Sequence, residues 1–389
     1  MSIINKKIGI VGGGQLGKMM ILEAKRLGFY VAVLDPAPDC PAHSICDLHI
    51  VAGFDKPEGY FELAKNSDVI TYEFEHINAG ALEILEDEGH LIYPSVTSLK
   101  AIQNKFSQKT ALEKNGIPVP RFGKAASADE IREFGKKERF GYPLMLKAAT
   151  GGYDGKGNAH IGDETDVENA FNQLGAGKIE LMVEEFVPFF MEISVIACRG
   201  IDGKRVIYPV AENMHSNSIL DTTIVPARIS ETVMTSAAGI ADKVMEVFEG
   251  VGTFCIELFV EENGTVSVNE VAPRPHNSGH YTIEGCFANQ FENHIRGIAG
   301  LPFGCVRLIS PAVMVNLLGE GDGEASLLGV EEAYADPNVH VHFYGKSKSK
   351  TGRKMGHITV VDEDIDGAIS KARKAKSLVR VVGELKVES

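Results

Sequence analysis

The feature that most constrains the fold is a glycine-rich turn, Gly12-x-Gly14-x-x-Gly17, between an apolar strand and a helix. The first hundred residues repeat this alternation of predicted strands and helices, over Lys6–Val11, Gln15–Leu27, Tyr30–Leu34, Glu58–Asn66 and Ser67–Tyr72. Strands that alternate with helices favour a parallel sheet with helices on its faces. An α/β fold with a doubly wound parallel sheet is therefore predicted for this part of the chain.

The same turn matches the fingerprint of dinucleotide-binding proteins, since Asp35 ends the next predicted strand. Glycines let the backbone approach a ligand, and the amino end of a helix offers free N–H groups to an anion. Any ligand with a phosphate group would suit this turn. Tight packing of strand against helix would also require the glycines. An NAD-dependent oxidoreductase and a purely structural turn are both open hypotheses for this motif.

The length of the chain, 389 residues, is too great for one ordinary core and favours two or three domains. The helical Asn104–Lys114 is followed by Asn115-Gly116-Ile117-Pro118-Val119-Pro120, whose glycine and prolines mark a boundary. From about residue 301 the pattern changes to short strands, a basic loop and a final helix over Ile365–Leu378. We expect three modules, over residues 1–100, 101–300 and 301–389.

Charge and hydropathy exclude several classes of protein. With 39 basic and 53 acidic residues, the formal charge of −14 argues against a nucleic-acid partner. No apolar run approaches the roughly 18 residues of a membrane span, and the first residues lack the layout of a signal peptide. The six cysteines form no Cys-x-x-Cys pair, which favours reduced thiols. We expect a cytoplasmic protein without a membrane partner.

A second glycine-rich segment follows Lys147, which comes directly after the apolar strand predicted over Pro143–Leu146. Residues 151–157 contain four glycines and an embedded lysine. Such a segment suits a mobile flap whose amides and ammonium group cover a triphosphate. It is not a Walker loop, because the Gly-Lys-Ser/Thr ending is absent. A flexible hairpin tip is the alternative.

A hairpin in the middle module places two carboxylates together. Asn263-Gly264 predicts a two-residue turn closed by Glu262 and Thr265, and counting back along both strands sets Glu257 opposite Glu270. Carboxylates about 5 Å apart repel unless a cation lies between them. Mg²⁺ bound by one or two carboxylates and by substrate phosphates meets that requirement. Two solvated glutamates are a weaker alternative, because both strands are otherwise apolar.

Several blocks occur in a specific order along the chain: Gly12-Gly13-Gly14-Gln15-Leu16-Gly17, Tyr72-Glu73-Phe74-Glu75, the 151–157 segment, 269–280 and Gly352-Arg353-Lys354-Met355-Gly356-His357. Together they resemble the 5-(carboxyamino)imidazole ribonucleotide synthetase family of the ATP-grasp superfamily. The resemblance implies an ATP-grasp architecture: an amino-terminal doubly wound parallel-sheet domain, a central two-lobed ATP-grasp domain and a small carboxy-terminal β-rich domain.

The resemblance also implies an ATP site. Lys105 and Lys147 would contact the phosphates beneath the 151–157 flap. The candidate nucleotide-binding residues in and next to the flap are Gly152, Tyr153, Asp154, Gly155, Lys156, Gly157 and Asn158. The adenine would lie against residues Glu184, Glu185, Phe186 and Val187, the ribose against Glu192, and His215 would line the same pocket. Glu257 and Glu270 would bind Mg²⁺, with Asn269 or water completing the ligand shell.

For the second substrate, aminoimidazole ribonucleotide, the implied contacts come from all three modules. Gln15, Leu16 and Glu75 would border it. Arg274, His276, Asn277 and Ser278 would line the reacting centre, where Arg274, His276 and Asp154 are the candidate catalytic residues. Lys346, Arg353 and Lys354 would clamp the phosphate, since charge-assisted bonds to phosphate are strong. A plain solvated loop is the alternative for this basic run.

The implied reaction uses ATP to activate bicarbonate as carboxyphosphate and transfers the carboxyl group to the exocyclic amine of aminoimidazole ribonucleotide. A homodimer is the oligomer that the family implies. Three other functions are open at this stage: a formate-using glycinamide ribonucleotide transformylase, an NAD-dependent oxidoreductase, and a regulatory module that binds ATP without turnover.

Overall fold

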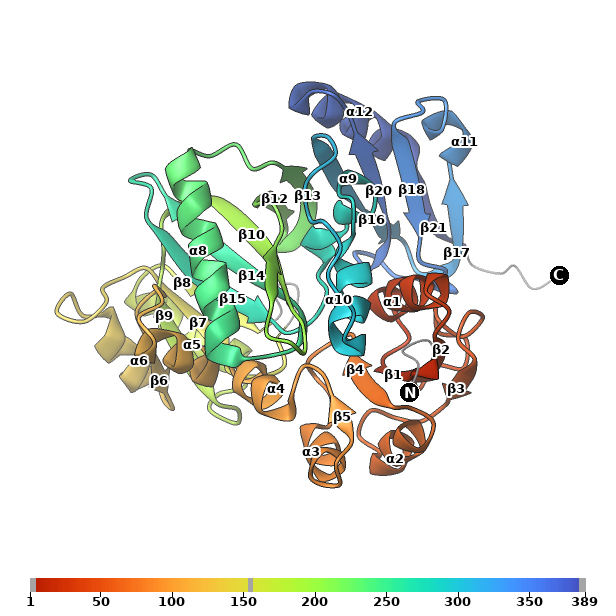
Figure 1. Ribbon diagram of the computed structural model, residues 1–389. Helices are drawn as coiled ribbons and strands as arrows, with labels where there is room; N and C mark the ends of the chain where they lie inside the picture. Colours follow the sequence, from red (N-terminus) through yellow and green to blue (C-terminus); the bar gives the residue numbers. More distant parts are fainter. Residues whose placement is uncertain (1–4, 153–156, 385–389) are drawn as a thin grey trace.

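Five parallel strands form the amino-terminal sheet, in the order β3-β2-β1-β4-β5 (Figure 1). The computed structural model describes residues 5–152 and 157–384. The strands are β1 (Lys7–Val11), β2 (Tyr30–Leu34), β3 (Leu48–Ile50), β4 (Val69–Tyr72) and β5 (Leu91–Ile92), and the helices are α1 (Gln15–Arg26), α2 (Pro57–Lys65), α3 (Ala79–Asp87) and α4 (Val96–Gln103). Apolar clusters cover both faces of the sheet, so the doubly wound parallel sheet is confirmed.

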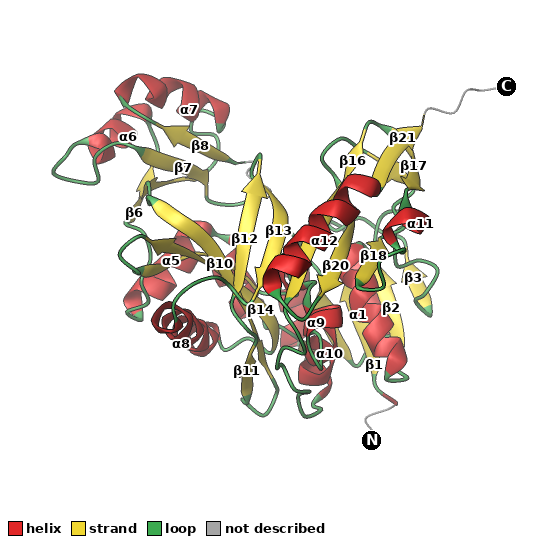
Figure 2. Cartoon of the chain, turned by 90° about the horizontal axis from the view of Figure 1, so that it is seen from above, coloured by secondary structure: helices red, strands yellow, loops and turns green. Residues whose placement is uncertain are grey.

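A second, antiparallel sheet has the order β6-β9-β7-β8 and lies at one end of the molecule with two helices (Figure 2). Its elements are β6 (Phe122–Ala125), α6 (Ala128–Gly135), β7 (Leu144–Ala148), β8 (Asn158–Ile161), α7 (Val167–Gln173) and β9 (Leu181–Glu185). The strand that we predicted to end at Leu146 continues to Ala148, so Lys147 lies inside β7. An apolar pattern ends before a lysine, whereas here the lysine is buried within the strand.

The largest sheet among the described residues has twelve strands. Its middle part comprises β10 (Phe189–Arg199), β11 (Arg205–Ile207), β12 (Ala211–Ser216), β13 (Ile219–Val225), β14 (Gly252–Glu261) and β15 (Val266–Ala272), and its carboxy-terminal part comprises β16 (Ala312–Glu320), β17 (Gly323–Leu328), β18 (Val339–Phe343), β19 (Lys348–Ser349), β20 (Lys354–Val361) and β21 (Arg380–Glu384). Because β13 pairs with β16, the sheet runs without a break past residue 301.

Helices fix the sheets to one another. Those that flank the large sheet are α5 (Lys105–Lys114), α8 (Glu231–Phe248), α9 (Thr282–Gly285), α10 (Gln290–Ala299), α11 (Val330–Ala333) and α12 (Ile365–Leu378). Phe291, Ile295 and Ile298 of α10 share one apolar core with α1 and β1. This shared core holds the glycine turn against the large sheet.

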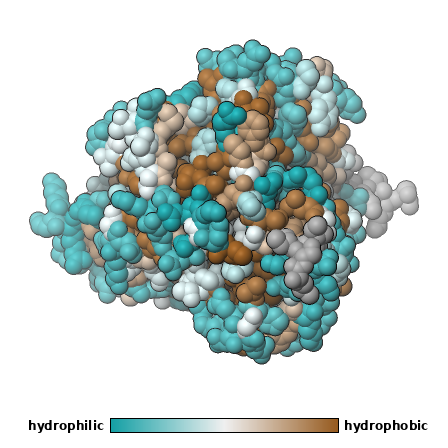
Figure 3. All heavy atoms as spheres, in the orientation of Figure 1, coloured by the Kyte–Doolittle hydropathy of each residue, from teal (hydrophilic) through white to brown (hydrophobic). Residues whose placement is uncertain are grey.

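Polar side chains cover most of the periphery on the face seen in Figure 1, and apolar surface shows mainly toward its middle (Figure 3). Within residues 5–152 and 157–384, no helix combines the length and apolar character needed to cross a membrane. All six cysteines lie in the described ranges and are free thiols.

Candidate active site

The β14–β15 hairpin carries the two facing carboxylates, but its turn differs from the prediction. The Glu261 N–H donates to the Thr265 carbonyl at 3.0 Å, so three residues, 262–264, form the loop. Gly264 has a φ of +83°, as the last position of such a loop requires. The predicted closing pair of Glu262 and Thr265 is therefore wrong. A sequence pattern does not distinguish a two-residue loop from a three-residue loop at Asn-Gly.

A β-bulge corrects the register before the site is reached. Leu258 pairs with Val268, whereas Glu257 pairs with Glu270, which leaves Asn269 as the extra residue. The predicted opposition of Glu257 and Glu270 is confirmed. Bulges re-aim side chains beside active sites, and this one lets two consecutive polar residues reach lysines: Asn269 accepts from Lys147 at 3.2 Å, and Glu270 pairs with Lys105.

The electrostatics of the carboxylate pair fit a divalent cation. Burial, and next the negative charge of Glu270, raise the pKa of Glu257 to about 7. A cation bound by Glu257 and Glu270 would offset the repulsion between the two carboxylates, because a nearby positive charge favours the ionised form of each. Carboxylate oxygens are also the ligands that Mg²⁺ prefers. Glu257 and Glu270 thus have the chemistry of a magnesium site.

Glu184 on β9 holds a cluster of buried charges. One of its oxygens pairs with Lys147 and the other with Lys109. Lys109 was not among the predicted site residues, although it lies four residues after Lys105 and hence on the same face of α5. Its side chain is 2% exposed, and burial, together with the charge of Lys147, lowers its pKa to about 8 despite Glu184.

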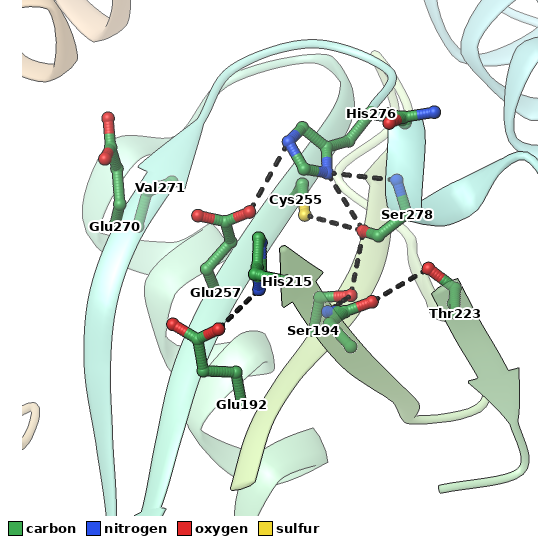
Figure 4. A network of polar contacts seen from close by, with 12 residues as sticks. Glu192, Ser194, His215, Thr223, Cys255, Glu257, Glu270, Val271, His276 and Ser278 are labelled. Atoms are coloured by element: carbon green, nitrogen blue, oxygen red, sulfur yellow. Dashed lines mark hydrogen bonds and ion pairs between the residues drawn. The ribbon is translucent and has the colours of Figure 1, made fainter. Parts of the chain in front are cut away.

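The expected adenine and ribose contacts lie beside this cluster. The Glu185 N–H donates to the Arg121 carbonyl, and the Glu185 carboxylate binds the Arg121 guanidinium at 2.6 Å, while Phe186 is exposed. Glu192 on β10 and His215 on β12 form an ion pair of 2.5 Å (Figure 4). Burial opposes protonation of His215, but the hydrogen bond and charge of Glu192 outweigh it and raise its pKa.

Glu75 and Arg274 connect the amino-terminal sheet to the end of the hairpin. The guanidinium holds both carboxylate oxygens, at 2.6 Å and 3.2 Å. Burial works against the charge on Glu75, yet Arg274 overcomes it and lowers the pKa of Glu75 to about 2. Both side chains are largely buried. The pair therefore holds the end of the hairpin to the amino-terminal module through a largely buried ion pair.

His276 follows Arg274 and approaches the carboxylate pair. Its Nε2 lies 3.5 Å from Glu257, and its Nδ1 lies 2.9 Å from the Ser278 hydroxyl. Burial, followed by the charges of Arg274 and Lys354, lowers the pKa of His276 well below its usual value, so the ring is neutral. Figure 4 shows His276, Glu257 and Glu270 on the same side of the hairpin.

Asn277 and Ser278 make interior contacts instead of pointing at an open surface. The Asn277 amide exchanges two hydrogen bonds with Asn316 on β16, at 2.9 Å and 2.6 Å. Ser278 accepts from the hydroxyl of Ser194 at 2.8 Å. Both residues are buried. Their side chains anchor the 276–278 loop, and only His276 of this segment reaches the carboxylates.

The glycine turn is occupied by carboxylates of the chain itself. Glu73 accepts from the N–H groups of Gly14 and Gly17 at 2.6 Å and 2.7 Å, and Asp35 accepts from Gly13 at 2.9 Å. A side chain at Gly14 would lie 2.6 Å from the Glu73 carboxylate. These amides are therefore already bonded, and the fingerprint serves a structural turn here. Glu73 belongs to the Tyr72-Glu73-Phe74-Glu75 block, but the sequence of that block does not predict that Glu73 binds the N–H groups of the glycine turn.

The basic loop meets the same turn. Lys346 donates to the Gln15 side chain at 2.7 Å and to the Lys354 carbonyl at 2.5 Å. Leu16 is buried in the core of the first module. Arg353 is exposed and donates to the Lys348 carbonyl at 3.0 Å. The structure thus brings Lys346 and Lys354 to the amino end of α1, with Arg353 at the rim.

The flap is described only at its two ends. Its predicted residues Tyr153, Asp154, Gly155 and Lys156 lie outside the described residues. Gly152 and Gly157 lie side by side, and the Ala148 N–H donates to the Gly157 carbonyl at 2.7 Å. Asn158 pairs with Lys147 across β7 and β8. The carboxy-terminal end of the segment is therefore anchored to the backbone of β7 beside Lys147, with Gly152 next to it.

Three family models match the chain in order. A ribonucleotide synthetase preATP-grasp domain matches residues 5–103, an ATP-grasp domain residues 110–291, and a phosphoribosylaminoimidazole carboxylase C-terminal domain residues 312–371. These matches confirm the expected ATP-grasp architecture.

Comparisons over the whole chain agree with the family models. An N5-carboxyaminoimidazole ribonucleotide synthase of Bacillus subtilis is 43% identical over 364 residues, which cover 92% of both chains. A crystal structure of the synthetase from Thermotoga maritima has 49% identity and a TM-score of 0.89, and covers 97% of this chain and 100% of the other. The synthase from Aspergillus clavatus, solved in complex with ADP and 5-aminoimidazole ribonucleotide, has 35% identity and a TM-score of 0.89 over 97% and 99% of the two chains.

Proposed function

Because the chain belongs to the N5-carboxyaminoimidazole ribonucleotide synthase family of ATP-grasp enzymes, we infer that its site performs this family's reaction. The protein is an ATP-dependent carbon–nitrogen ligase of purine biosynthesis. It carboxylates 5-aminoimidazole ribonucleotide to N5-carboxyaminoimidazole ribonucleotide. An NAD-dependent oxidoreductase is excluded as the identity of the chain. The observation that carries the assignment of roles is the Glu257–Glu270 pair with Lys105 beside it.

In the first step, an oxygen of bicarbonate attacks the γ-phosphorus of ATP, and the bond to the departing ADP oxygen breaks. Both reactants are anions, so the barrier contains their mutual repulsion. Lys105 and Lys147 supply positive charge that is already fixed in place by Glu270 and Glu184. Preorganised charges of this kind stabilise the transition state without reorganisation. We assign these two lysines to the phosphates.

Carboxyphosphate then releases CO₂ and phosphate, and the exocyclic amine forms the new bond to carbon and loses one proton. We propose that Glu75 and Arg274 fix the amine substrate between the modules, because their ion pair joins the amino-terminal module to the hairpin. Lys346, Arg353 and Lys354 would bind its phosphate, with Gln15 beside Lys346. The flap, including the candidate catalytic Asp154, would exclude water from carboxyphosphate.

Glu257 and Glu270 would hold Mg²⁺, and their oxygen donors and the raised pKa of Glu257 support this assignment. When bound, the cation neutralises charge on the phosphates of ATP. Asn269 is the neighbouring oxygen donor on the bulge. Glu192 and His215 form the side of the nucleotide pocket that we assign to the ribose.

Other properties extend this proposal. Modules over residues 1–100, 101–300 and 301–389 would each contribute to the amine-substrate site. We propose a homodimer that works on small molecules in the cytoplasm. Free thiols at all six cysteines fit a reducing compartment.

Glu257→Gln and Glu270→Gln test the assigned roles. Each change removes a charge and keeps the volume, so each should lower Mg²⁺-dependent ADP release by about a hundredfold or more with the fold intact. Glu262→Gln, in the loop of the same hairpin, is the matched control and should match wild type. Wild-type rates of ADP release in either site variant would contradict the assignment.

A further inference from the structure

A line of hydrogen bonds runs from β13 to His276 through the interior of the large sheet (Figure 4). The Thr223 hydroxyl donates to the Asn213 carbonyl oxygen at 2.9 Å, and the Asn213 amide donates to the Ser194 hydroxyl at 2.8 Å. Ser194 donates to Ser278 at 2.8 Å, and Ser278 lies 2.9 Å from His276 Nδ1. The line therefore joins four elements of the fold to one imidazole ring.

The line has a direction, because an amide NH₂ group only donates. Ser194 accepts from Asn213 and so has its own hydrogen available for Ser278. Ser278 accepts that hydrogen bond and in turn directs its own hydrogen to His276 Nδ1. Thr223 lies at the start of the line, where it donates to the Asn213 carbonyl oxygen while the Asn213 NH₂ group faces Ser194 on β10.

A longer contact from a backbone group agrees with this direction. The Ser278 N–H lies 3.3 Å from His276 Nδ1, and a backbone N–H cannot accept. Nδ1 is thus an acceptor toward both Ser278 groups. In a neutral imidazole the hydrogen must then lie on Nε2, the nitrogen that faces Glu257 at 3.5 Å.

Burial keeps bulk water from competing for the hydrogen bonds of this line. Thr223 is 0% exposed, Ser194 and Ser278 are 1% exposed, and Asn213 is 7% exposed. Buried polar groups are paired, and a broken pair is not replaced by bulk water. The order of donors along the line is therefore held by the protein itself.

We propose that Thr223, Asn213 and Ser194 are positioning residues that hold His276 in its Nε2–H tautomer, so that it directs a donor at Glu257. The role in catalysis rests on the proposed function, because it requires Glu257 to be a metal ligand. Hydrogen bonds from a second residue orient a ligating carboxylate. None of the three residues would touch substrate.

The first test is the tautomer of His276 in the full chain, measured by nitrogen NMR with ¹⁵N-labelled histidine. His276→Gln identifies its signals among the 12 histidines. We expect an unprotonated Nδ1 in wild type. A protonated Nδ1 in wild type would overturn the proposal before any variant is made.

Two variants alter the line itself. Asn213→Asp replaces the donor by an acceptor, so Ser194 must donate toward β12 and Ser278 is free to turn away from the ring. Thr223→Val keeps the shape and removes the donor to the Asn213 carbonyl oxygen. Both should raise the fraction of Nδ1–H, because only the longer contact from the Ser278 N–H, at 3.3 Å, then opposes a hydrogen on Nδ1. Thr223→Ser should restore the wild-type spectrum. Thr222→Val, on the opposite face of β13, is the matched control. Unchanged His276 signals in both site variants would contradict the proposal.

Kinetics separate the positioning role from the proposed function. Loss of one neutral hydrogen bond corresponds to roughly a threefold to tenfold change. Thr223→Val should lower kcat by about this factor and leave the KM for ATP unchanged, and Thr223→Ser should restore kcat. A shifted tautomer with wild-type kcat would support the hydrogen-bond line and contradict a role for His276 in the reaction.

Discussion

Glu257 and Glu270 face each other across β14 and β15, and the strands reach this pairing through two offsetting deviations. The loop has one residue more than the sequence predicts, and the bulge at Asn269 adds one residue to β15. Without the bulge, the longer loop would move Glu270 out of the pairing. With it, Asn269 and Glu270 both reach lysines. The hairpin therefore aligns the metal and phosphate groups of the site in one short segment.

Lys109→Met should weaken the binding of ATP. Removing Lys109 leaves Glu184 paired with Lys147 alone, so Lys147 is held more tightly away from the phosphates. We expect the KM for ATP to rise about tenfold, with little change in the KM for aminoimidazole ribonucleotide, in a steady-state assay of ADP release. Lys114→Met, on the exposed end of α5, should change neither. An equal rise in both constants would indicate general damage to the fold.

Gly17→Ala tests the structural role of the glycine turn. A methyl group there would press against the Gly12 carbonyl, and overpacking typically costs about 1 to 3 kcal/mol. Urea unfolding should show this loss of stability. Gly239→Ala on the exposed face of α8 has open space and should stabilise the chain by about 0.5 to 1 kcal/mol. Equal stabilities of Gly17→Ala and wild type would contradict the tight turn.

Glu75→Gln should reveal a stability that depends on pH. The pKa of Glu75 is about 2 in the fold, below its ordinary value of 4.5, so its charge stabilises the fold above about pH 4.5. The contribution, on the order of 3 kcal/mol, is lost as the pH falls toward 2. Urea unfolding should show a large difference between variant and wild type at pH 7 and less than half of it at pH 3. A difference that is independent of pH would contradict the ion pair with Arg274.

Arg353→Ala tests the phosphate clamp. A charge-assisted contact is worth roughly 1.5 to 3 kcal/mol, so the KM for aminoimidazole ribonucleotide should rise about tenfold to a hundredfold. The kinetic constants for ATP should not change, because its phosphates are assigned to Lys105 and Lys147. The nucleoside without phosphate should be an equally poor substrate for variant and wild type. A variant that still prefers the nucleotide fully would show that Arg353 does not bind the phosphate.

Much of the fold follows from patterns that survive in the sequence. The alternation of strands and helices predicts the first sheet, and counting back from the Asn263-Gly264 turn predicts that Glu257 faces Glu270. The loop length and the bulge leave no such trace, because each inserts a single residue without changing which residues are apolar. The extra loop residue and the bulge shift the register in opposite directions, so Glu257 still faces Glu270.

Contacts between distant segments were also outside the reach of the sequence. Lys109 reads as a solvated helix residue, yet β9 covers it with Glu184. Glu73 reads as part of a substrate block, yet it fills the glycine turn. The hydroxyl of Ser278 faces inward because β10 places Ser194 beneath it. Each of these positions is decided by packing between modules and not by local preference.

The most direct test of the assigned reaction is the fate of labelled bicarbonate. Wild-type protein with ATP, Mg²⁺ and aminoimidazole ribonucleotide should transfer the label to the ribonucleotide and release one ADP for each carboxyl group transferred. ADP release should require both bicarbonate and the ribonucleotide. Labelled formate with glycinamide ribonucleotide should give no product. Transfer of formate, or ADP release that leaves bicarbonate unincorporated, would contradict the account.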